Sequence, residues 1–209
     1  MGSYPALRGI PLLKLISKFQ SRCPDGPGYS AGYFLEVAER IGESGSDGVE
    51  FLKSQLSNPS AVKVRAAVYA LAARTRAPET ITMLLSFLGD KRPMVVAESI
   101  DGLRRNHHGA SLKRILPLSS HPNPYIAGAS LRYVSAFNRT RAKDLLIKSL
   151  KNPRQVVRAN ACDELDRLNV SEAIPHLTPL LRDPAKPVRQ AARTAVDNLS
   201  AGRRSKKKR

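Results

Sequence analysis

The chain has 209 residues with 42% hydrophobic content, enough for one packed core, and 35 basic against 17 acidic side chains give it a formal net charge of +18. No apolar run approaches the roughly 18 residues of a transmembrane helix, and no basic segment followed by an apolar stretch opens the chain as in a secretory signal. We therefore expect an intracellular protein without a membrane span, cytoplasmic or, in a eukaryote, nuclear, and the excess of cations favours a negatively charged partner.

The first 45 residues predict a helix pair that differs from the rest of the chain. One helix is expected over 10–19 and a second over 31–42, with a loop rich in proline and glycine between them. Tyr33 and Val37 are spaced to lie on one face of the second helix. We interpret residues 1–45 as a divergent pair that caps one end of a larger stack.

From residue 46 onward, apolar side chains recur every 31 residues. The first column consists of Val64, Val95, Ile126, Val157 and Val188. Two further columns follow it at offsets of four and eight residues, the spacing of a single helix face. A fourth column, which belongs to a second helix, consists of Leu84, Ile115, Leu146 and Leu177. Each repeat is therefore predicted to be a helix pair, and such pairs must stack in order to bury their apolar faces.

The predicted turns agree with this period. Asn152-Pro153 and Asp183-Pro184 directly precede two helices of the first column, and Asp90 precedes Pro93 by three residues. We expect the Asn and Asp side chains to act as N-caps, with proline in the first helical turn, where its missing N–H costs nothing. Short links of this kind make neighbouring helices antiparallel.

The segment from Leu180 to Ala192 resembles a HEAT repeat, because Asp183-Pro184 stands at its turn and Val188-Arg189 opens its second helix. The resemblance implies a right-handed, all-α solenoid of about six stacked antiparallel helix pairs. Five HEAT-like repeats are then expected at about 46–76, 77–107, 108–138, 139–169 and 170–200. Arg65, Arg158 and Arg189 match the arginine of the family, for which the resemblance implies contacts with the turns of neighbouring repeats.

A broken row of cations is predicted along one rim of the stack. Arg74, Arg105 and Arg167 occupy equivalent positions two residues after the third column, near the ends of their helices. The remaining members of this predicted basic rim are Arg104, Arg132, Arg139, Arg141 and Lys143. The rim is a candidate partner-binding surface, although cations at a helix C-terminus also stabilise the helix itself.

The last nine residues form a second concentration of charge. Residues 201–209 have no apolar content to order them, and we expect a disordered basic tail. Its cations are Arg203, Arg204, Lys206, Lys207, Lys208 and Arg209.

No pattern in the sequence indicates catalysis or a cofactor. Adjacent helical residues such as His107 and His108 point about 100° apart, which is poor geometry for joint metal ligation. The two cysteines, Cys23 and Cys162, lie on different predicted repeats, so we expect no disulfide. We predict a protein with no catalytic residues, no metal and no cofactor.

Three functions are compatible with these features. The first is a non-catalytic scaffold or adaptor that binds an acidic protein through its basic rim and concave surface. The second is nonspecific binding to the phosphate backbone of nucleic acid, which the net charge favours. The aromatic content of 5% gives no indication of base stacking. The third follows from the resemblance of such short repeats to phycobilin lyases, whose bilin-handling role the strong positive charge disfavours.

Overall fold

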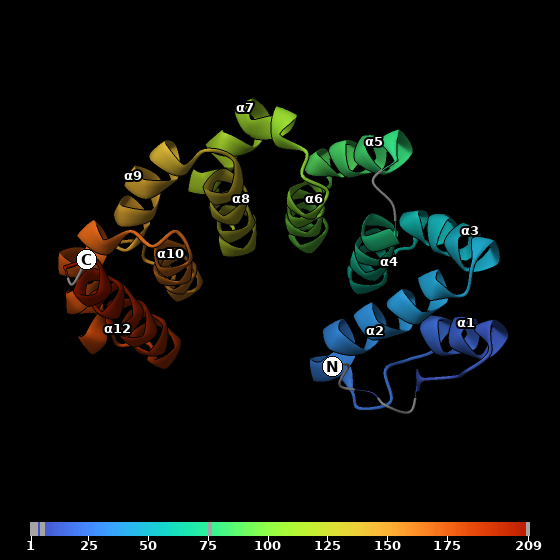
Figure 1. The fold of residues 1–209 in the computed structure, drawn as a ribbon. Helices are drawn as coiled ribbons and strands as arrows, with labels where there is room; N and C mark the ends of the chain where they lie inside the picture. Colours follow the sequence, from blue (N-terminus) through green and yellow to red (C-terminus); the bar gives the residue numbers. More distant parts are fainter. Residues whose placement is uncertain (1–3, 5–6, 75–76, 208–209) are drawn as a thin grey trace. The chain divides into compact units, whose positions relative to one another are not determined.

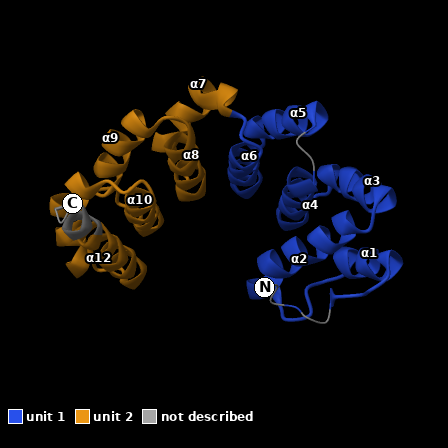
Figure 2. Ribbon diagram, in the orientation of Figure 1, with its two compact units in different colours: residues 1–108 blue, residues 109–209 orange. Residues whose placement is uncertain are grey.

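The computed structural model describes residues 4, 7–74 and 77–207, with side chains through residue 201. The described residues form helices and turns without any strand, as the predicted all-α solenoid requires. The chain divides into two compact units, residues 1–108 and 109–209 (Figure 2). The boundary lies one residue after the expected junction between the repeats 77–107 and 108–138. Among the described residues, no helix combines the length and the apolar character that crossing a membrane requires.

Unit 1 consists of six α-helices in two rows (Figure 1). The helices α2 (Ser30–Glu43), α4 (Ala61–Arg74) and α6 (Pro93–Arg105) pack side by side in succession. Each of the other three precedes its partner in the chain: α1 (Leu12–Gln20), α3 (Ser46–Ser54) and α5 (Pro78–Ser86). The expected capping pair therefore corresponds to α1 and α2.

Unit 2 repeats the arrangement with α8 (Pro124–Phe137), α10 (Gln155–Arg167) and α12 (Lys186–Lys207) as the packed row. Their partners are α7 (Leu112–Ile115), α9 (Arg139–Ser149) and α11 (Ile174–Leu177). The helices α7 and α11 are short because each passes into a 3-10 segment at Pro117 or Pro179. Proline lacks the N–H that would continue the α-helical bonding.

The apolar columns form the core, as the period predicts. Val64, Val95, Val157 and Val188 are at most 1% exposed, and Ile126 is 4% exposed. The column of the second helix is completely buried from Leu84 to Leu177. Because these side chains come from successive repeats, the same seam is buried again at each step of the stack.

The turns differ from the expected N-caps. The side chains of Asp90, Asn152 and Asp183 accept a hydrogen bond from the backbone N–H two residues later, at 2.8–2.9 Å, and the helix begins only after that turn. Arg92 and Arg154 are the N-cap residues of α6 and α10. Two intervening residues, one of them often proline, separate the side-chain acceptor from the helix, so these side chains order the turn rather than cap the helix.

One member of this series of turns is a histidine. His121 Nδ1 accepts a hydrogen bond from the Asn123 N–H at 3.0 Å, the contact that Asp and Asn make in the other turns. Asn123, two residues after His121, is a true N-cap of α8, because its side chain accepts from the Tyr125 N–H. The imidazole therefore replaces the carboxylate without loss of the turn.

The last helix extends into the basic tail. Helix α12 continues through residue 207, past the last packed side chain, Leu199. Arginine, lysine and alanine are strong helix formers, and a helix that is already nucleated by packing extends through them at little cost. Lys208 and Arg209 lie outside the described residues, as do the side chains of Arg203, Arg204, Lys206 and Lys207.

Candidate binding surface

In unit 2 the family arginine Arg158 bridges two consecutive turns. Arg158 donates to both carboxylate oxygens of Asp183, at 2.7 and 2.8 Å, and to the carbonyl of Asn152, at 2.8 Å. The turn before α10 is thereby bound to the turn before α12. Arg189 makes the corresponding carbonyl contact within its own turn, with Asp183 O at 2.8 Å. These two arginines are occupied by the fold itself.

In unit 1 the corresponding bridge is made by an arginine of the later turn, Arg92. Arg92 donates to both carboxylate oxygens of Asp90 and reaches back to the carbonyl of Asn58, at 3.0 Å. Arg65, the family arginine, instead pairs with Glu98 at 3.1 Å. One guanidinium therefore still links the turn before α4 to the turn before α6, but it comes from the later repeat.

Two of the three rim arginines of unit 1 are engaged with their own chain. Arg104 pairs with Asp101 at 3.3 Å, and Arg105 pairs with the buried Glu98 at 2.7 Å. Arg105 also lies over the Tyr69 ring, 5.0 Å from its centroid. Arg74 is exposed and forms no ion pair with the described residues. Of this group, Arg74 alone combines exposure with a free guanidinium in the described part of unit 1.

Two rim arginines of unit 2 lie on the packed row of helices. Arg132 on α8 donates to Asn160 Oδ1 on α10 at 3.4 Å. Arg167 at the end of α10 pairs with Glu164 at 2.6 Å, one turn earlier on the same helix. Both are thus partly neutralised or held by neighbouring side chains.

The other three rim cations of unit 2 come together in the first turns of α9. We call Arg139, Arg141 and Lys143 the α9 cluster. Arg139 donates to the Leu168 carbonyl, and Lys143 pairs with Glu172 at 3.3 Å. The exposed Arg141 side chain forms no hydrogen bond or ion pair with the described residues. Arg139 and Lys143 also line a polar crevice of about 420 Å³. The other residues lining this crevice are Thr140, Asn169, Val170, Ser171 and Glu172.

The position of each rim cation along its helix separates two groups. Arg74, Arg104, Arg105 and Arg167 lie in the last turns of α4, α6 and α10, where a positive charge is favoured by the helix dipole. The α9 cluster begins at the N-terminus of its helix, whose first turn has no acidic residue. There the dipole opposes the positive charges of Arg139 and Arg141, so it does not explain why cations occupy this turn.

Charge is concentrated in the same unit. Residues 109–209 contain 21 basic and 7 acidic side chains, so unit 2 carries +14 of the net charge of +18. The acids on α10 are close together, and burial, with Glu164 and Asp166 adding to it, raises the pKa of Asp163. The electrostatic field of unit 2 is therefore strongly positive, with a single small acidic patch.

The described residues do not bring together the side chains of a metal site or of an activated nucleophile. No three His, Cys, Asp or Glu residues there are arranged to hold a metal ion. Burial, together with the neighbouring carboxylates of Asp163 and Asp183, raises the pKa of the Cys162 thiol to about 12. A thiol in this state is a packing group rather than a nucleophile.

Sequence reasoning missed several residues that organise the surface. Arg92 and Glu98 stand outside the 31-residue columns, and no sequence signal distinguished them. Asn138 caps α9 by accepting from the Arg141 N–H at 3.0 Å. The Asn that directly precedes this helix was the available signal, as an N-cap residue.

These features define the class of protein, and comparisons with known proteins agree. The chain is a helical-repeat protein with a HEAT-like fold. Residues 112–197 match the family model described as HEAT repeats. The sequence has no significant match among the curated proteins.

Two solved structures share the fold. An engineered protein has a TM-score of 0.51 and 18% identity, with 91% of this chain and 97% of that chain covered. The complex of CpcE and CpcF of phycocyanin lyase from Nostoc sp. PCC7120 has a TM-score of 0.53 and 16% identity, with 95% of this chain and 85% of that chain covered. At these identities the likeness concerns the fold alone.

Proposed function

We propose that this protein is a non-catalytic scaffold that binds an acidic protein partner through the α9 cluster of unit 2. The observation that supports this most directly is the place of Arg139, Arg141 and Lys143 at a helix N-terminus. In the first turn, the charges of Arg139 and Arg141 each cost the helix about 0.3–1 kcal/mol at low ionic strength. An anion supplied by a partner would offset that cost, above all at Arg141, which forms no hydrogen bond or ion pair through its side chain with the described residues.

The chemistry around the cluster favours a protein over a nucleic acid. The crevice beside Arg139 and Lys143 offers hydroxyl and amide groups, which match carboxylates and backbone groups of a peptide chain. Among the aromatic residues of unit 2, Tyr133 is completely buried and Phe137 is half-buried against it, with ring centroids 4.7 Å apart. Only Tyr125 is exposed, so a row of aromatic platforms for stacking bases is not present in unit 2.

The proposal is tested with defined polyanions. Binding of fluorescein-labelled polyglutamate, a random DNA duplex and a single-stranded RNA is measured by anisotropy over a salt series. We expect polyglutamate to bind and the double substitution Arg141→Glu with Lys143→Glu to weaken it at least tenfold. The matched control, Lys148→Glu with Lys151→Glu, makes the same change in charge at the other end of α9 and is expected to retain most of the affinity.

Two results would contradict the proposal. Equal losses in both double variants would mean that total charge, rather than the α9 cluster, determines binding. Tighter binding of the duplex or the RNA than of polyglutamate at physiological salt would favour the phosphate-backbone function instead, and its affinity would then fall steeply with salt.

A further inference from the structure

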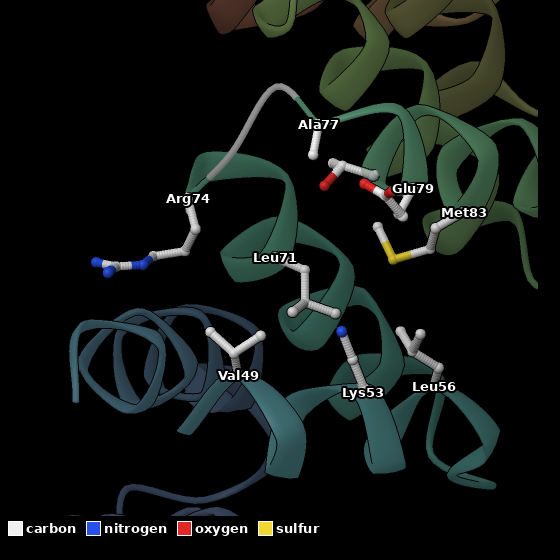
Figure 3. A pocket seen from close by; sticks show the side chains of 9 residues that line it. Val49, Lys53, Leu56, Leu71, Arg74, Ala77, Glu79 and Met83 are labelled. Atoms are coloured by element: carbon white, nitrogen blue, oxygen red, sulfur yellow. The ribbon is translucent and has the colours of Figure 1, made fainter. Parts of the chain in front are cut away.

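Unit 1 contains an apolar pocket that the α9 cluster does not involve. It has a volume of about 480 Å³ and lies where α3, α4 and α5 meet (Figure 3). Most of its wall is apolar, with Val49, Leu56, Leu71 and Met83 among the lining residues. This volume is within the range of about 300–1,000 Å³ that ligand pockets occupy.

Charged side chains border the pocket on different sides. In Figure 3, Lys53 points its ammonium group toward Leu71, and Arg74 extends at one edge. Glu79 lies across the pocket, on the same side as Met83. Lys53 and Arg74 are exposed, and neither forms an ion pair with a residue that the structure describes. Each of these two cations is thus available to an anion at the border of the pocket.

The Arg74 side chain also packs against α2. Its Cδ lies 3.5 Å from the point where a Cβ on Gly42 of α2 would stand. The aliphatic stem therefore packs against this buried glycine, while the guanidinium forms no ion pair with the described residues. An arginine stem held in this way loses less freedom when its charged group binds an anion.

We propose that this pocket is a second docking site, which takes a large apolar side chain from an acidic peptide segment. The apolar side chain would enter between Leu71 and Met83, and carboxylates of the flanking acidic residues would meet Arg74 and Lys53. The charges at the border lie apart from one another around an apolar centre, an arrangement that fits an extended chain crossing the opening. Glu79 would keep the acidic residues of the peptide on the other side. The site does not depend on the α9 cluster.

Three labelled eight-residue peptides test the site by fluorescence anisotropy. Each has the same acidic flanks, and the central residue is Phe, Leu or Ala. We expect the Phe and Leu peptides to bind about tenfold tighter than the Ala peptide, the effect of burying one large apolar side chain. Met83→Glu should abolish this preference, and Glu79→Gln should strengthen the binding of all three peptides.

Control variants distinguish binding in the pocket from the effect of net charge and from loss of the fold. Leu13→Glu makes the same kind of change on α1, where the side chain is 81% exposed, and should leave the preference intact. Arg74→Ala should weaken all three peptides alike, because it removes charge but not the apolar wall. Circular dichroism must show that each variant keeps its helical content.

The outcomes are decisive for the pocket. Equal affinity for the Phe and Ala peptides would overturn the proposal, even if both bind through their acidic flanks. Failure of all three peptides to bind would overturn it as well. Binding of dodecanoate that Met83→Glu abolishes, without any preference among the peptides, would assign the pocket to a small apolar acid instead.

Discussion

Arg158 and Asp183 form a bidentate ion pair between α10 and the turn before α12, with N–O distances of 2.8 and 2.7 Å. The side chains are only 12% and 5% exposed. Removing one partner of such a pair leaves the other charge buried without compensation. We expect Arg158→Met to lower the free energy of unfolding by about 2–3 kcal/mol, measured by urea denaturation at neutral pH.

The same pair should make stability depend on pH at the acid end. Hydrogen bonds from Arg158 hold the pKa of Asp183 below its usual value, and Arg92 does the same for Asp90. A carboxylate whose pKa is depressed by folding contributes stability that is complete above about pH 4 and is lost as the pH falls through the folded-state pKa. Urea midpoints between pH 7 and pH 3 should therefore fall less steeply in Arg158→Met than in the unaltered protein. Parallel curves would show that the pair does not contribute.

Gly48 should tolerate no side chain. A Cβ on this residue would stand 1.9 Å from the carbonyl oxygen of Ile41, so the backbones of α2 and α3 could not keep their present separation. We expect Gly48→Ala to destabilise the protein by about 2 kcal/mol or more, in the range of overpacked cores. Gly32 within α2 is the control, since its Cβ would meet nothing within 4 Å. Gly32→Ala should raise the melting temperature.

His121 should be replaceable by another acceptor but not by alanine. Its Nδ1 takes the place of a carboxylate or amide oxygen in the turn before α8. Loss of the acceptor in His121→Ala should cost about 1 kcal/mol, as for other caps and turns, whereas His121→Asn should cost little. Chemical denaturation of both variants measures the difference, and equal stabilities would exclude a role for the imidazole in the turn.

Arg141→Glu should separate stability from binding. The substitution places a negative charge in the first turn of α9, beside the N–H groups that Asn138 caps. The helix dipole then favours the side chain, and we expect stability to rise by about 0.5–1 kcal/mol while polyglutamate binding weakens. Calorimetric melting and anisotropy measure the two effects. A variant that loses both stability and binding would indicate that Arg141 has a structural role.

The two cysteines should differ in reactivity. The thiol of Cys162 is completely buried, and burial raises its pKa to about 12, whereas Cys23 is half-buried. Iodoacetamide at pH 8 should modify Cys23 in the native protein and reach Cys162 only after unfolding. Mass spectrometry of tryptic peptides distinguishes the sites, and rapid labelling of Cys162 under native conditions would mean that α10 opens readily.

The sequence by itself determined the repeat. A helix that must bury one face in every stacked unit requires apolar side chains at the same places in each period, so Val95 or Val157 could be assigned to the core from spacing alone. It also located the turns, since Asp90, Asn152 and Asp183 do order them, although through a hydrogen bond two residues on rather than as N-caps.

Only the tertiary structure decided which charged groups are used by the fold. Arg65 and Arg158 match the same family position, yet Arg158 bridges two turns while Arg92 takes over that bridge in unit 1. Burial depends on the period of a helix, so it can be predicted from the spacing of apolar residues along the sequence. The partner of a long, flexible arginine depends on the distance between residues about 30 positions apart in the sequence. That distance is fixed by the stacking of the repeats, and stacking also forms the pocket beside Leu71.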